Sequence, residues 1–476
     1  MVAIYPEQEI STGYHKMNYS IIQKSRLEGS LRLDAEYYQP EYLQIDNKLS
    51  KNTEFLNNLA EKIICGPFGS AILNSDYKKE GVPLVRVSNL NNLFVQDENL
   101  VFIDQDLSGF LKKYQVEKDD IVVSQRGTVA LFSKITEYYP KWNISANLIS
   151  IKKSTKINFD YLLAFLNSKF GISQLIRRLS GQVQPKITTD DIKQIKIFLP
   201  DKNVQQKIGS LISLSKCEIE NSKILSHKAE SLLLGELGLE AFDTEQKLTS
   251  LVNLSDCQKA NRIDAEYFES KYLTIQTALS KTRLSLLSKN FEILRGEIIK
   301  YSDTGNVGVI KTKQLGKQYI NFDVEDKTDD DMSRGEKLPT LSNNDILFAS
   351  MGVGSLGKAN IYYEFENNGQ FTIDSTLKIF RAKKGSLILP EVLQVFLSSY
   401  LGRELIYQNI VGSSGIISIY EHYIKNLPVP ILPKHTQEKI ADLVRKSHES
   451  RKKSKELLEE AKRKVEELIE EATPLR

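Results

Sequence analysis

The sequence of 476 residues predicts an α+β protein that arose by tandem duplication of a β-rich domain. The first observation is that RLDAEYYQPEYL at Arg32–Leu43 returns as RIDAEYFESKYL at Arg262–Leu273. The second is that further matched segments follow both motifs in the same order. The third is a long polar stretch at the end of each copy, whose apolar residues have the spacing of a coiled coil. Each copy should therefore contain a β-rich domain with a covering helix, followed by one long helix.

The order of the matched segments separates duplication of a domain from copying of one short motif. Three further pairs are DIVVSQRG at 120–127 with DILFASMG at 345–352, ISANLISIK at 144–152 with IDSTLKIFR at 373–381, and FLNSKFG at 165–171 with FLSSYLG at 396–402. The partners stay between about 224 and 232 residues apart. A single copied motif cannot produce this order, so the repeated unit is a little over two hundred residues long.

The repeat divides the chain into four segments. We expect a first β-rich domain with an N-terminal leader at 1–200 and a first long helix at 201–240. A second β-rich domain at 241–433 and a second long helix at 434–476 follow. Within each domain, the DAEY motif begins a helix, and short runs of β-branched and aromatic residues predict strands. A compact helix at about 160–179, or 390–410 in the second copy, should cover the strands.

The two long helices have an apolar seam with spacings of four and three residues. Its residues are Ile208, Ile212, Ile219 and Leu233 in the first helix, and Ile440, Val444, Leu458, Val465 and Leu468 in the second. Serines fill other seam positions and would allow close packing in one register. Two ordinary amphipathic surface helices are the alternative interpretation. A helix of ~35 residues would span ~50 Å, which favours a coiled-coil spacer that holds two domains a fixed distance apart.

Composition and charge restrict the class of protein. Hydrophobic residues make up 41% of the chain and charged residues 26%, which is typical of a soluble globular protein. No apolar run has the ~18–20 residues needed to span a bilayer, and the N-terminus lacks the pattern of a secretory signal. The three cysteines have no metal-ligand spacing, so we expect a cytoplasmic protein. A net charge of +3 is compatible with DNA binding, because phosphate attraction depends on local clusters of charge.

Catalytic motifs are not found in the sequence. It contains neither a phosphate-binding loop nor a GxSxG elbow, and its five histidines lack metal-ligand spacing. We therefore predict no catalytic residue, no metal and no cofactor. Asp34 with Glu36, and Asp264 with Glu266, could suggest a metal nuclease, but no strand-borne Glu-x-Lys accompanies them. The simpler interpretation is that these aspartates interact with free amides at a helix N-terminus.

Polar and glycine-rich turns near the predicted strands fit nucleic-acid recognition better than catalysis. CGPFGS at 65–70 predicts a tight turn that exposes Phe68; alternatively, Phe68 packs onto its own domain. Arg, Asn and Gln can form paired hydrogen bonds with base edges, and Lys and Arg neutralise phosphates. The candidate DNA-binding residues are Gly66, Phe68, Gly69, Ser70, Arg86, Ser88, Asn89, Asn91, Gln125, Arg126, Thr128, Gln182, Gln184 and Lys186 in the first copy, and Lys311, Lys313, Ser350, Lys358, Ser413 and Ser414 in the second.

The ordered set of segments resembles the DNA-specificity (S) subunit of type I restriction–modification systems, over about residues 16–470. It comprises CGPFGSAILNSDYKKEGVPLVRVSNL, DIVVSQRGT, ISANLISIK, FLNSKFG, GQVQPKIT and QQKI. The resemblance implies two target-recognition domains, each reading one half of a bipartite, asymmetric double-stranded DNA site through the major groove. It also implies that the long helices pack antiparallel and set the gap between the half-sites.

The resemblance further implies that this subunit is not itself catalytic. In the family, two adenine-N6 methyltransferase (M) subunits dock on the S subunit, supply the S-adenosylmethionine site and flip the base. Restriction/motor (R) subunits can join them.

The second copy departs from the first at the turns that carry the resemblance. It has LRGEII at 294–299 in place of the GPFGS turn, and GSSGIIS at 412–418 in place of GQVQPKIT. Roles of Phe68, Gln182 and Gln184 therefore do not transfer to it, and the two half-sites should differ in sequence. Two other functions stay open: an enzyme with an unrecognised nuclease or methyltransferase site, and a non-enzymatic protein–protein adaptor.

Overall fold

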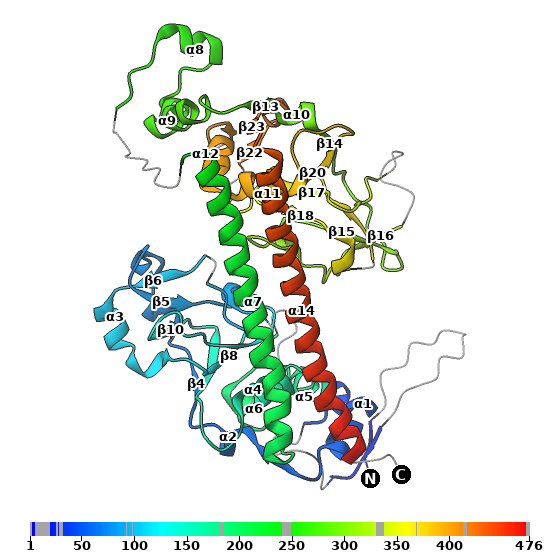
Figure 1. Ribbon diagram of the computed structural model, residues 1–476. Helices are drawn as coiled ribbons and strands as arrows, with labels where there is room; N and C mark the ends of the chain where they lie inside the picture. The colour runs from blue at the N-terminus through cyan, green and yellow to red at the C-terminus, as the bar shows by residue number, and fades with distance from the viewer. Residues whose placement is uncertain are drawn as a thin grey trace. The chain divides into compact units, whose positions relative to one another are not determined.

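A computed structural model describes residues 2–4, 20–24, 27, 32–91, 93–97, 99–179, 185–239, 249–329, 338–367, 369–412 and 417–472. The chain forms two compact units. Unit 1 contains Met1–Glu218 and Lys453–Arg476, and unit 2 contains Ile219–Lys452. Two long helices contribute residues to both units: α7 (Lys202–Glu236) and α14 (Lys434–Ala472), which are coloured green and red in Figure 1.

Unit 1 is built mainly from short strands. Its elements before α7 are β1 (Val2–Ile4), β2 (Ser20–Ile22), the 3-10 turn η2 (Ala35–Tyr38), α1 (Pro40–Lys48), β3 (Thr53–Phe55), α2 (Leu56–Leu59), β4 (Ile63–Cys65), β5 (Val82–Val85), β6 (Val101–Ile103), α3 (Gln105–Phe110), β7 (Gln115–Val116), β8 (Ile121–Ser124), β9 (Phe132–Lys134), β10 (Trp142–Ile144), β11 (Leu148–Ile151), α4 (Phe159–Leu166), α5 (Lys169–Ile176), α6 (Thr189–Lys193) and β12 (Lys196–Phe198). One four-stranded sheet has the order β4-β11-β8-β9, and another has the order β6-β5-β10-β7.

Unit 2 repeats this arrangement. Its elements between the long helices are α8 (Leu254–Ala260), η7 (Ala265–Phe268), α9 (Ser270–Leu279), β13 (Leu284–Leu286), α10 (Leu287–Asn290), β14 (Phe291–Arg295), β15 (Val307–Ile310), β16 (Lys327–Thr328), β17 (Ile346–Ala349), β18 (Ala359–Ile361), β19 (Gln370–Ile373), β20 (Leu377–Ala382), α11 (Pro390–Ser398), α12 (Tyr400–Tyr407), β21 (Ile410–Val411), β22 (Ser418–Ile419), α13 (Glu421–Lys425) and β23 (Pro428–Pro430). The sheet β14-β20-β17-β18 corresponds to β4-β11-β8-β9, and β16-β15-β19 corresponds to the other.

The strand registers confirm the duplication predicted from the sequence. In unit 1, Leu148 of β11 pairs with Ser124 of β8, and in unit 2 Leu377 of β20 pairs with Ala349 of β17. One parallel pair interrupts the antiparallel pairing in each unit, β5 with β10 and β15 with β19. The α+β fold class, with two β-rich domains and two long helices that pack together, is therefore confirmed.

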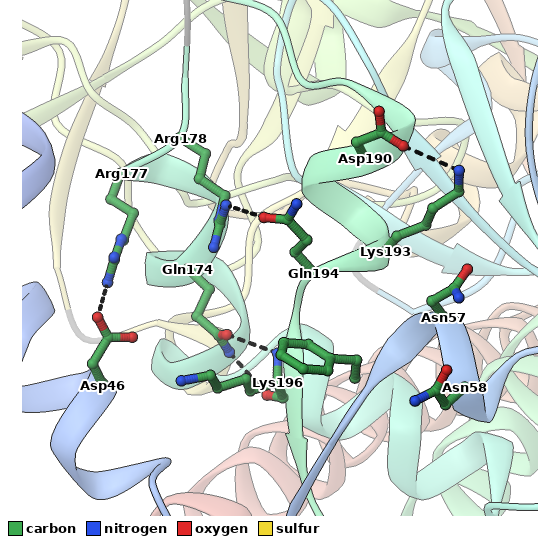
Figure 2. A pocket seen from close by; sticks show the side chains of 11 residues that line it. Asp46, Asn57, Asn58, Gln174, Arg177, Arg178, Asp190, Lys193, Gln194 and Lys196 are labelled. Atoms are coloured by element: carbon green, nitrogen blue, oxygen red, sulfur yellow. Dashed lines mark hydrogen bonds and ion pairs between the residues drawn. The ribbon is translucent and has the colours of Figure 1, made fainter. Parts of the chain in front are cut away.

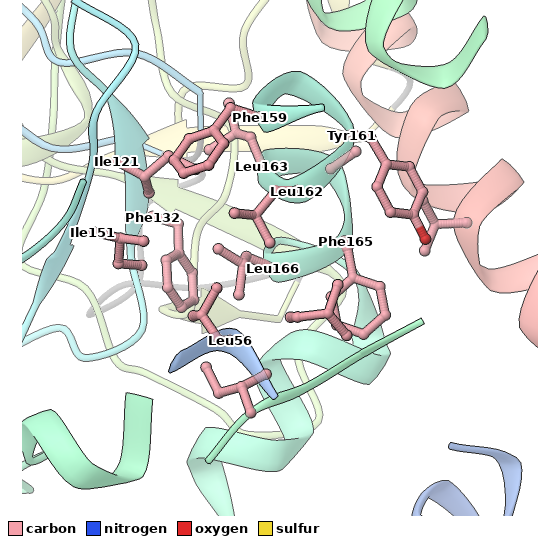
Figure 3. Packing of buried hydrophobic residues seen from close by; sticks show 14 of the residues in the cluster. Leu56, Ile121, Phe132, Ile151, Phe159, Tyr161, Leu162, Leu163, Phe165 and Leu166 are labelled. Atoms are coloured by element: carbon pink, nitrogen blue, oxygen red, sulfur yellow. The ribbon is translucent and has the colours of Figure 1, made fainter. Parts of the chain in front are cut away.

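The core of unit 1 lies between the β4-β11-β8-β9 sheet and helix α4, as Figure 3 shows. Strands β8 and β11 are buried along their whole length, which explains their nearly continuous apolar sequences. Leu162, Leu163 and Leu166 of α4 are fully buried in the same cluster. At about 25 cal/mol per Å² of apolar area, the burial of each such side chain stabilises the fold by about 2 kcal/mol.

The single covering helix predicted at about 160–179 is wrong, because two short helices occupy this segment. Helix α4 ends before Asn167, and the Ser168 hydroxyl caps α5 by accepting a hydrogen bond from the amide of Gly171 (3.5 Å). A Cβ atom at Gly171 would lie 2.5 Å from the Phe165 carbonyl oxygen, so this corner requires glycine. The corner between α11 and α12 repeats the arrangement with Ser399 and Gly402.

The repeated DAEY motif forms a 3-10 turn ahead of a helix, which corrects the predicted helix start. Asp34 makes no side-chain capping bond; instead, the Arg32 guanidinium binds its carboxylate through two hydrogen bonds of 2.9 and 2.7 Å. Arg32 also lies over the Tyr37 ring, 4.5 Å from its centroid. This pairing lowers the pKa of the Asp34 carboxyl. Arg262, Asp264 and Tyr267 repeat the cluster in unit 2, so the motif encodes one compact local structure.

The seam residues of the long helices pack into the cores of the two units. Ile208, Ile212, Leu458 and Val465 belong to the unit 1 core, Leu233, Ile440 and Val444 belong to the unit 2 core, and Ile219 and Leu468 are half-buried. Buried serines hold the middle of the seam. The hydroxyl oxygens of Ser215 and Ser454 lie 2.7 Å apart in unit 1, and those of Ser222 and Ser447 lie 2.8 Å apart in unit 2.

The direction of the two helices follows from contacts within unit 2. Ser222 of α7 faces Ser447 of α14, and fourteen residues further along α7 Glu236 accepts a hydrogen bond from Thr436 (3.0 Å). Residue numbers thus rise along one helix as they fall along the other, and the helices are antiparallel.

Candidate nucleic-acid interface

The main candidate surface of unit 1 is the sheet edge where β4, β5 and β8 end around the turn 145–147. Three backbone hydrogen bonds join these strand ends to the turn: Gly66 N to Leu148 O (2.8 Å), Ser145 N to Val85 O (2.9 Å) and Gln125 N to Asn147 O (2.8 Å). The segments that follow the three strands therefore lie next to one another. These segments carry most of the DNA-binding residues predicted for the first copy.

A fourth segment joins the same edge from far along the chain. Arg126 and Lys186 form an isolated antiparallel bridge, and Ile187 N donates to Gln125 O (3.1 Å). The Arg126 side chain is exposed, and that of Lys186 is half-buried. Two cationic residues from segments sixty residues apart are thus neighbours along the backbone at this edge.

Unit 2 builds the same edge with the same hydrogen bonds. They are Gly296 N to Leu377 O (3.3 Å), Asp374 N to Ile310 O (3.2 Å), Ser350 N to Thr376 O (3.0 Å) and Ile419 N to Ser350 O (3.0 Å). Met351 and Ser418 form the bridge that corresponds to Arg126 and Lys186. The backbone of the edge is repeated, and the side chains on it are different.

Each edge has one glycine at its centre, Gly66 in unit 1 and the equivalent Gly296 in unit 2. A Cβ atom at Gly66 would lie 2.1 Å from the Ser145 carbonyl oxygen, and one at Gly296 would lie 1.8 Å from the Asp374 carbonyl oxygen. No real Cβ contact is this short, so the close backbone approach excludes any side chain at either position. Gly66, predicted as a DNA-binding residue, therefore has a structural reason to be glycine.

The predicted DNA-binding residues differ in exposure. Phe68, Gly69, Ser70, Ser88, Arg126, Thr128 and Lys313 are exposed; Gly66, Arg86, Asn91, Lys186, Lys311 and Lys358 are half-buried; and Asn89, Gln125 and Ser350 are buried. Gln182, Gln184, Ser413 and Ser414 lie outside the described residues.

The buried residues have partners inside their own units. Asn89 accepts a hydrogen bond from the amide of Arg86 (3.0 Å), and Gln314 accepts the equivalent bond from Lys311 (3.0 Å) in unit 2. Ser350 donates to the Thr376 carbonyl (3.0 Å), and Gln125 lies against the thiol of Cys65. Half-buried Asn91 accepts hydrogen bonds from two amides of its own turn. These side chains stabilise the conformation of loops whose exposed residues would bind DNA.

Two predicted cations already have partners within their own units. Arg86 donates to the Asn99 carbonyl (2.8 Å) and lies over the Tyr77 ring. Lys311 forms an ion pair with Asp326 (2.9 Å) and lies over the Tyr301 ring. Among the predicted cations, exposed Arg126 is therefore the most available for an external anion.

Sequence reasoning missed a charged cluster at the edge of unit 2. Arg295, which ends β14 directly before Gly296, forms an ion pair with Glu421 of α13. Lys425 and Lys378 approach the same carboxylate at 2.8 and 3.9 Å. The hydrogen bond from Arg295 lowers the pKa of Glu421 to about 2, and burial lowers the pKa of Lys378. The contact joins residues 126 positions apart, so no local sequence pattern marked it.

Glu421→Gln should remove much of the acid sensitivity of unit 2. The lowered pKa means that Glu421 contributes stability above its ordinary pKa near 4.5 and loses it as the pH falls toward about 2. Because Arg295 is largely exposed, we expect Glu421 to contribute about 1–2 kcal/mol to the free energy of unfolding at pH 7. Urea unfolding of the full chain at pH 7 and pH 3 measures the difference. Glu325→Gln, at an exposed carboxylate, is the control, and equal acid sensitivity of E421Q and the unsubstituted protein would contradict the prediction.

A separate polar cavity of about 620 Å³ lies in unit 1 between α1, α5, α6 and β12 (Figure 2). Its charged side chains are bound mainly to neighbours: Arg177 to Asp46 (2.6 Å), Lys193 to Asp190 (3.0 Å) and Arg178 to Gln194 (2.8 Å). Arg177 is also stacked over Tyr37, 4.2 Å from the ring centroid. The described residues that line the cavity include no His, Cys or Ser. We interpret it as part of the framework around the Arg32–Asp34–Tyr37 cluster.

Two other kinds of feature are absent from the described part of the chain. No group of three or more His, Cys, Asp or Glu side chains there could hold a metal ion. None of the helices described has both the length and the apolar character needed to cross a membrane.

Comparison with solved structures gives remote similarities. An S subunit of a type I restriction–modification system from M. genitalium is 14% identical, with 89% of this chain and 96% of that chain covered and a TM-score of 0.36. The HsdS subunit from Thermoanaerobacter tengcongensis is 14% identical, with 89% and 97% covered and a TM-score of 0.28. The type IIG restriction endonuclease BpuSI is 11% identical, with 42% and 32% covered and a TM-score of 0.29.

The sequence comparison is more specific. No curated protein sequence matches the chain. A family model described as the type I restriction modification DNA specificity domain matches residues 54–226. The match begins in β3, includes the whole sheet edge described above and ends within α7. Residues 54–226 of the chain are therefore similar to the DNA specificity domain of type I restriction–modification systems.

Proposed function

We propose that the chain is the DNA sequence-recognition subunit of a type I restriction–modification complex and binds a bipartite, asymmetric site. Each unit recognises one half-site through its sheet edge. One observation carries the proposal: the edge inside the matched domain recurs in unit 2 with the same backbone hydrogen bonds and different side chains. Recognition of two different half-site sequences requires different side chains, and the same backbone structure can carry both sets.

The two edges offer different chemistry to DNA. Unit 1 presents Arg126 and Lys186, and unit 2 presents Met351 and Ser418 at the corresponding bridge. An arginine can bind guanine through two hydrogen bonds in the major groove, whereas an apolar side chain cannot. This difference supports an asymmetric site rather than a palindrome.

The proposal includes two adenine-N6 methyltransferase subunits as partners. The clusters Arg32–Asp34–Tyr37 and Arg262–Asp264–Tyr267 have matching hydrogen bonds and ring contacts. Two equivalent local structures suit two copies of one partner. In this proposal the chain is not catalytic: the methyltransferase carries the methyl-donor site, and restriction/motor subunits bind where the system includes them.

The long helices α7 and α14 would set the gap between the half-sites. Each is continuous through residues of both units, and the buried serine pairs fix one register between them. Every residue of a continuous helix adds ~1.5 Å along the axis, so the number of residues determines the length of the connection.

Arg126→Ala should weaken recognition of the half-site read by unit 1 and leave the other unchanged. Loss of one paired hydrogen bond to a base costs about 1–3 kcal/mol and relaxes specificity at that base pair. Arg86→Ala should act on the same half-site. Fluorescence anisotropy with DNA altered in one half-site at a time measures both effects. Arg403→Ala, an exposed arginine of α12 in unit 2, is the control. A uniform loss across both half-sites would assign Arg126 to phosphate contact instead.

A further inference from the structure

The two sheet edges share one exposed apolar side chain at an equivalent position. Phe68 follows Gly66 by two residues in unit 1, and Ile298 follows Gly296 by two residues in unit 2. The glycines are equivalent because each donates its amide to the first residue of the next strand in its sheet, Leu148 or Leu377. Phe68 is 87% exposed and Ile298 is 58% exposed. The sequence comparison alone did not pair these two residues, since GPFGS and LRGEII share only the glycine.

The backbone around both side chains is anchored. In unit 1, Gly66 is fixed against the turn 145–147, Pro67 is buried, and the Phe68 carbonyl accepts a hydrogen bond from Ala71 N (2.8 Å). In unit 2, Glu297 forms a bridge with Asp374, and Ile299 is buried. The apolar side chains are thus held outward by their neighbours.

The neighbouring side chains change between the units while this position stays apolar. Arg126 corresponds to Met351 and Lys186 to Ser418, and Ser70 corresponds to Lys300. A large apolar side chain gains free energy only when it is removed from water. A position that stays both apolar and exposed in two otherwise different edges therefore indicates an apolar feature present in both half-sites.

We propose that Phe68 and Ile298 each contact the 5-methyl group of a thymine in the major groove. That methyl is the one apolar group that base pairs present there. The inference rests on the proposed function, in which adenine-N6 methylation requires an A·T pair in each half-site. Phe68 and Ile298 then provide the same apolar contact to each half-site, and the polar residues around them provide the differences.

Replacing thymine by deoxyuridine removes this methyl group and no hydrogen-bonding group. The experiment uses the full chain with its methyltransferase, on DNA that carries deoxyuridine for thymine in one half-site at a time. For the unsubstituted protein, we expect about fourfold weaker binding with either DNA, the value of one buried methyl group. Phe68→Ala should bind more weakly overall and lose the deoxyuridine effect in the unit 1 half-site only. Ile298→Ala should lose it in the other half-site only.

Phe110→Ala is the matched control, because Phe110 is 88% exposed and lies at the end of α3, on a different element of unit 1. It should retain the deoxyuridine effect in both half-sites. Phe68→Leu should preserve part of the effect and shows that the position needs apolar contact. If the unsubstituted protein binds its site but is insensitive to deoxyuridine, or if Phe68→Ala keeps full sensitivity, the inference is overturned while the proposed function stands. If it binds no bipartite site, the proposed function itself fails.

Discussion

Gly66→Ala is expected to destabilise unit 1 by about 2–3 kcal/mol and to abolish recognition of one half-site. The new Cβ would lie 2.1 Å from the Ser145 carbonyl oxygen, and backbone cannot move away as a flexible side chain can. Relief of the contact must displace the turn 145–147, to which the ends of β5 and β8 are bonded. Thermal unfolding of the full chain measures the stability, and methylation mapping measures the half-site.

Gly69→Ala is the matched control for this prediction. It lies in the same turn, and no atom lies within 4 Å of where its Cβ would be. It should keep the thermal stability of the unsubstituted protein. Gly296→Ala should repeat the effect of Gly66→Ala on the other half-site, because its Cβ would meet the Asp374 carbonyl oxygen at 1.8 Å. Equal behaviour of Gly66→Ala and Gly69→Ala would refute the framework role of Gly66.

Lengthening both long helices by seven residues is expected to widen the gap by about three base pairs and to leave both half-sites unchanged. Seven residues add ~10.5 Å to a helix, and successive base pairs are ~3.4 Å apart. The insertions belong between Glu218 and Ile219 and between Lys452 and Lys453, where the chain passes from one unit to the other. Seven residues preserve the seam phase, so the Ser215–Ser454 and Ser222–Ser447 pairs are retained.

An insertion in α7 alone is the control for the paired insertions. It should shift the serine pairs out of register and reduce both stability and binding. An unchanged gap with both helices lengthened, in a protein that still recognises both half-sites, would exclude the helices as the spacer.

The sequence predicted those features of the fold that depend on order and periodicity. The matched segments predicted the repeated topology because equivalent strands need equivalent apolar runs, as in β8 and β17. The spacing of α7 and α14 predicted two long helices. The serines of the seam face one another in pairs, as predicted for close packing of the two helices. The apolar residues of the seam also pack into the cores of the two units.

Features that depend on contacts between distant segments were not predictable from the sequence. Asn89 and Gln125 have the chemistry of base-reading residues, and only the fold shows that they are buried. The Arg295–Glu421 pair spans 126 residues, and the equivalence of Phe68 and Ile298 became visible only through the hydrogen bonds of Gly66 and Gly296. Arg32 and Asp34 are only two residues apart and form an ion pair. The local sequence is equally compatible with Asp34 capping a helix, so the pair could not be predicted from DAEY.

Methylation mapping in cells determines whether this chain directs DNA recognition. Cells would carry this chain together with the methyltransferase subunit of the same system, or that methyltransferase alone, and long-read sequencing would record adenine methylation across the genome. We expect a bipartite, asymmetric motif that is methylated only when this chain is present, with one half-site altered by Arg126→Ala. If the methyltransferase is expressed and bound to this chain, yet no new motif is methylated, the chain does not direct DNA recognition and a protein–protein adaptor explains the duplication better.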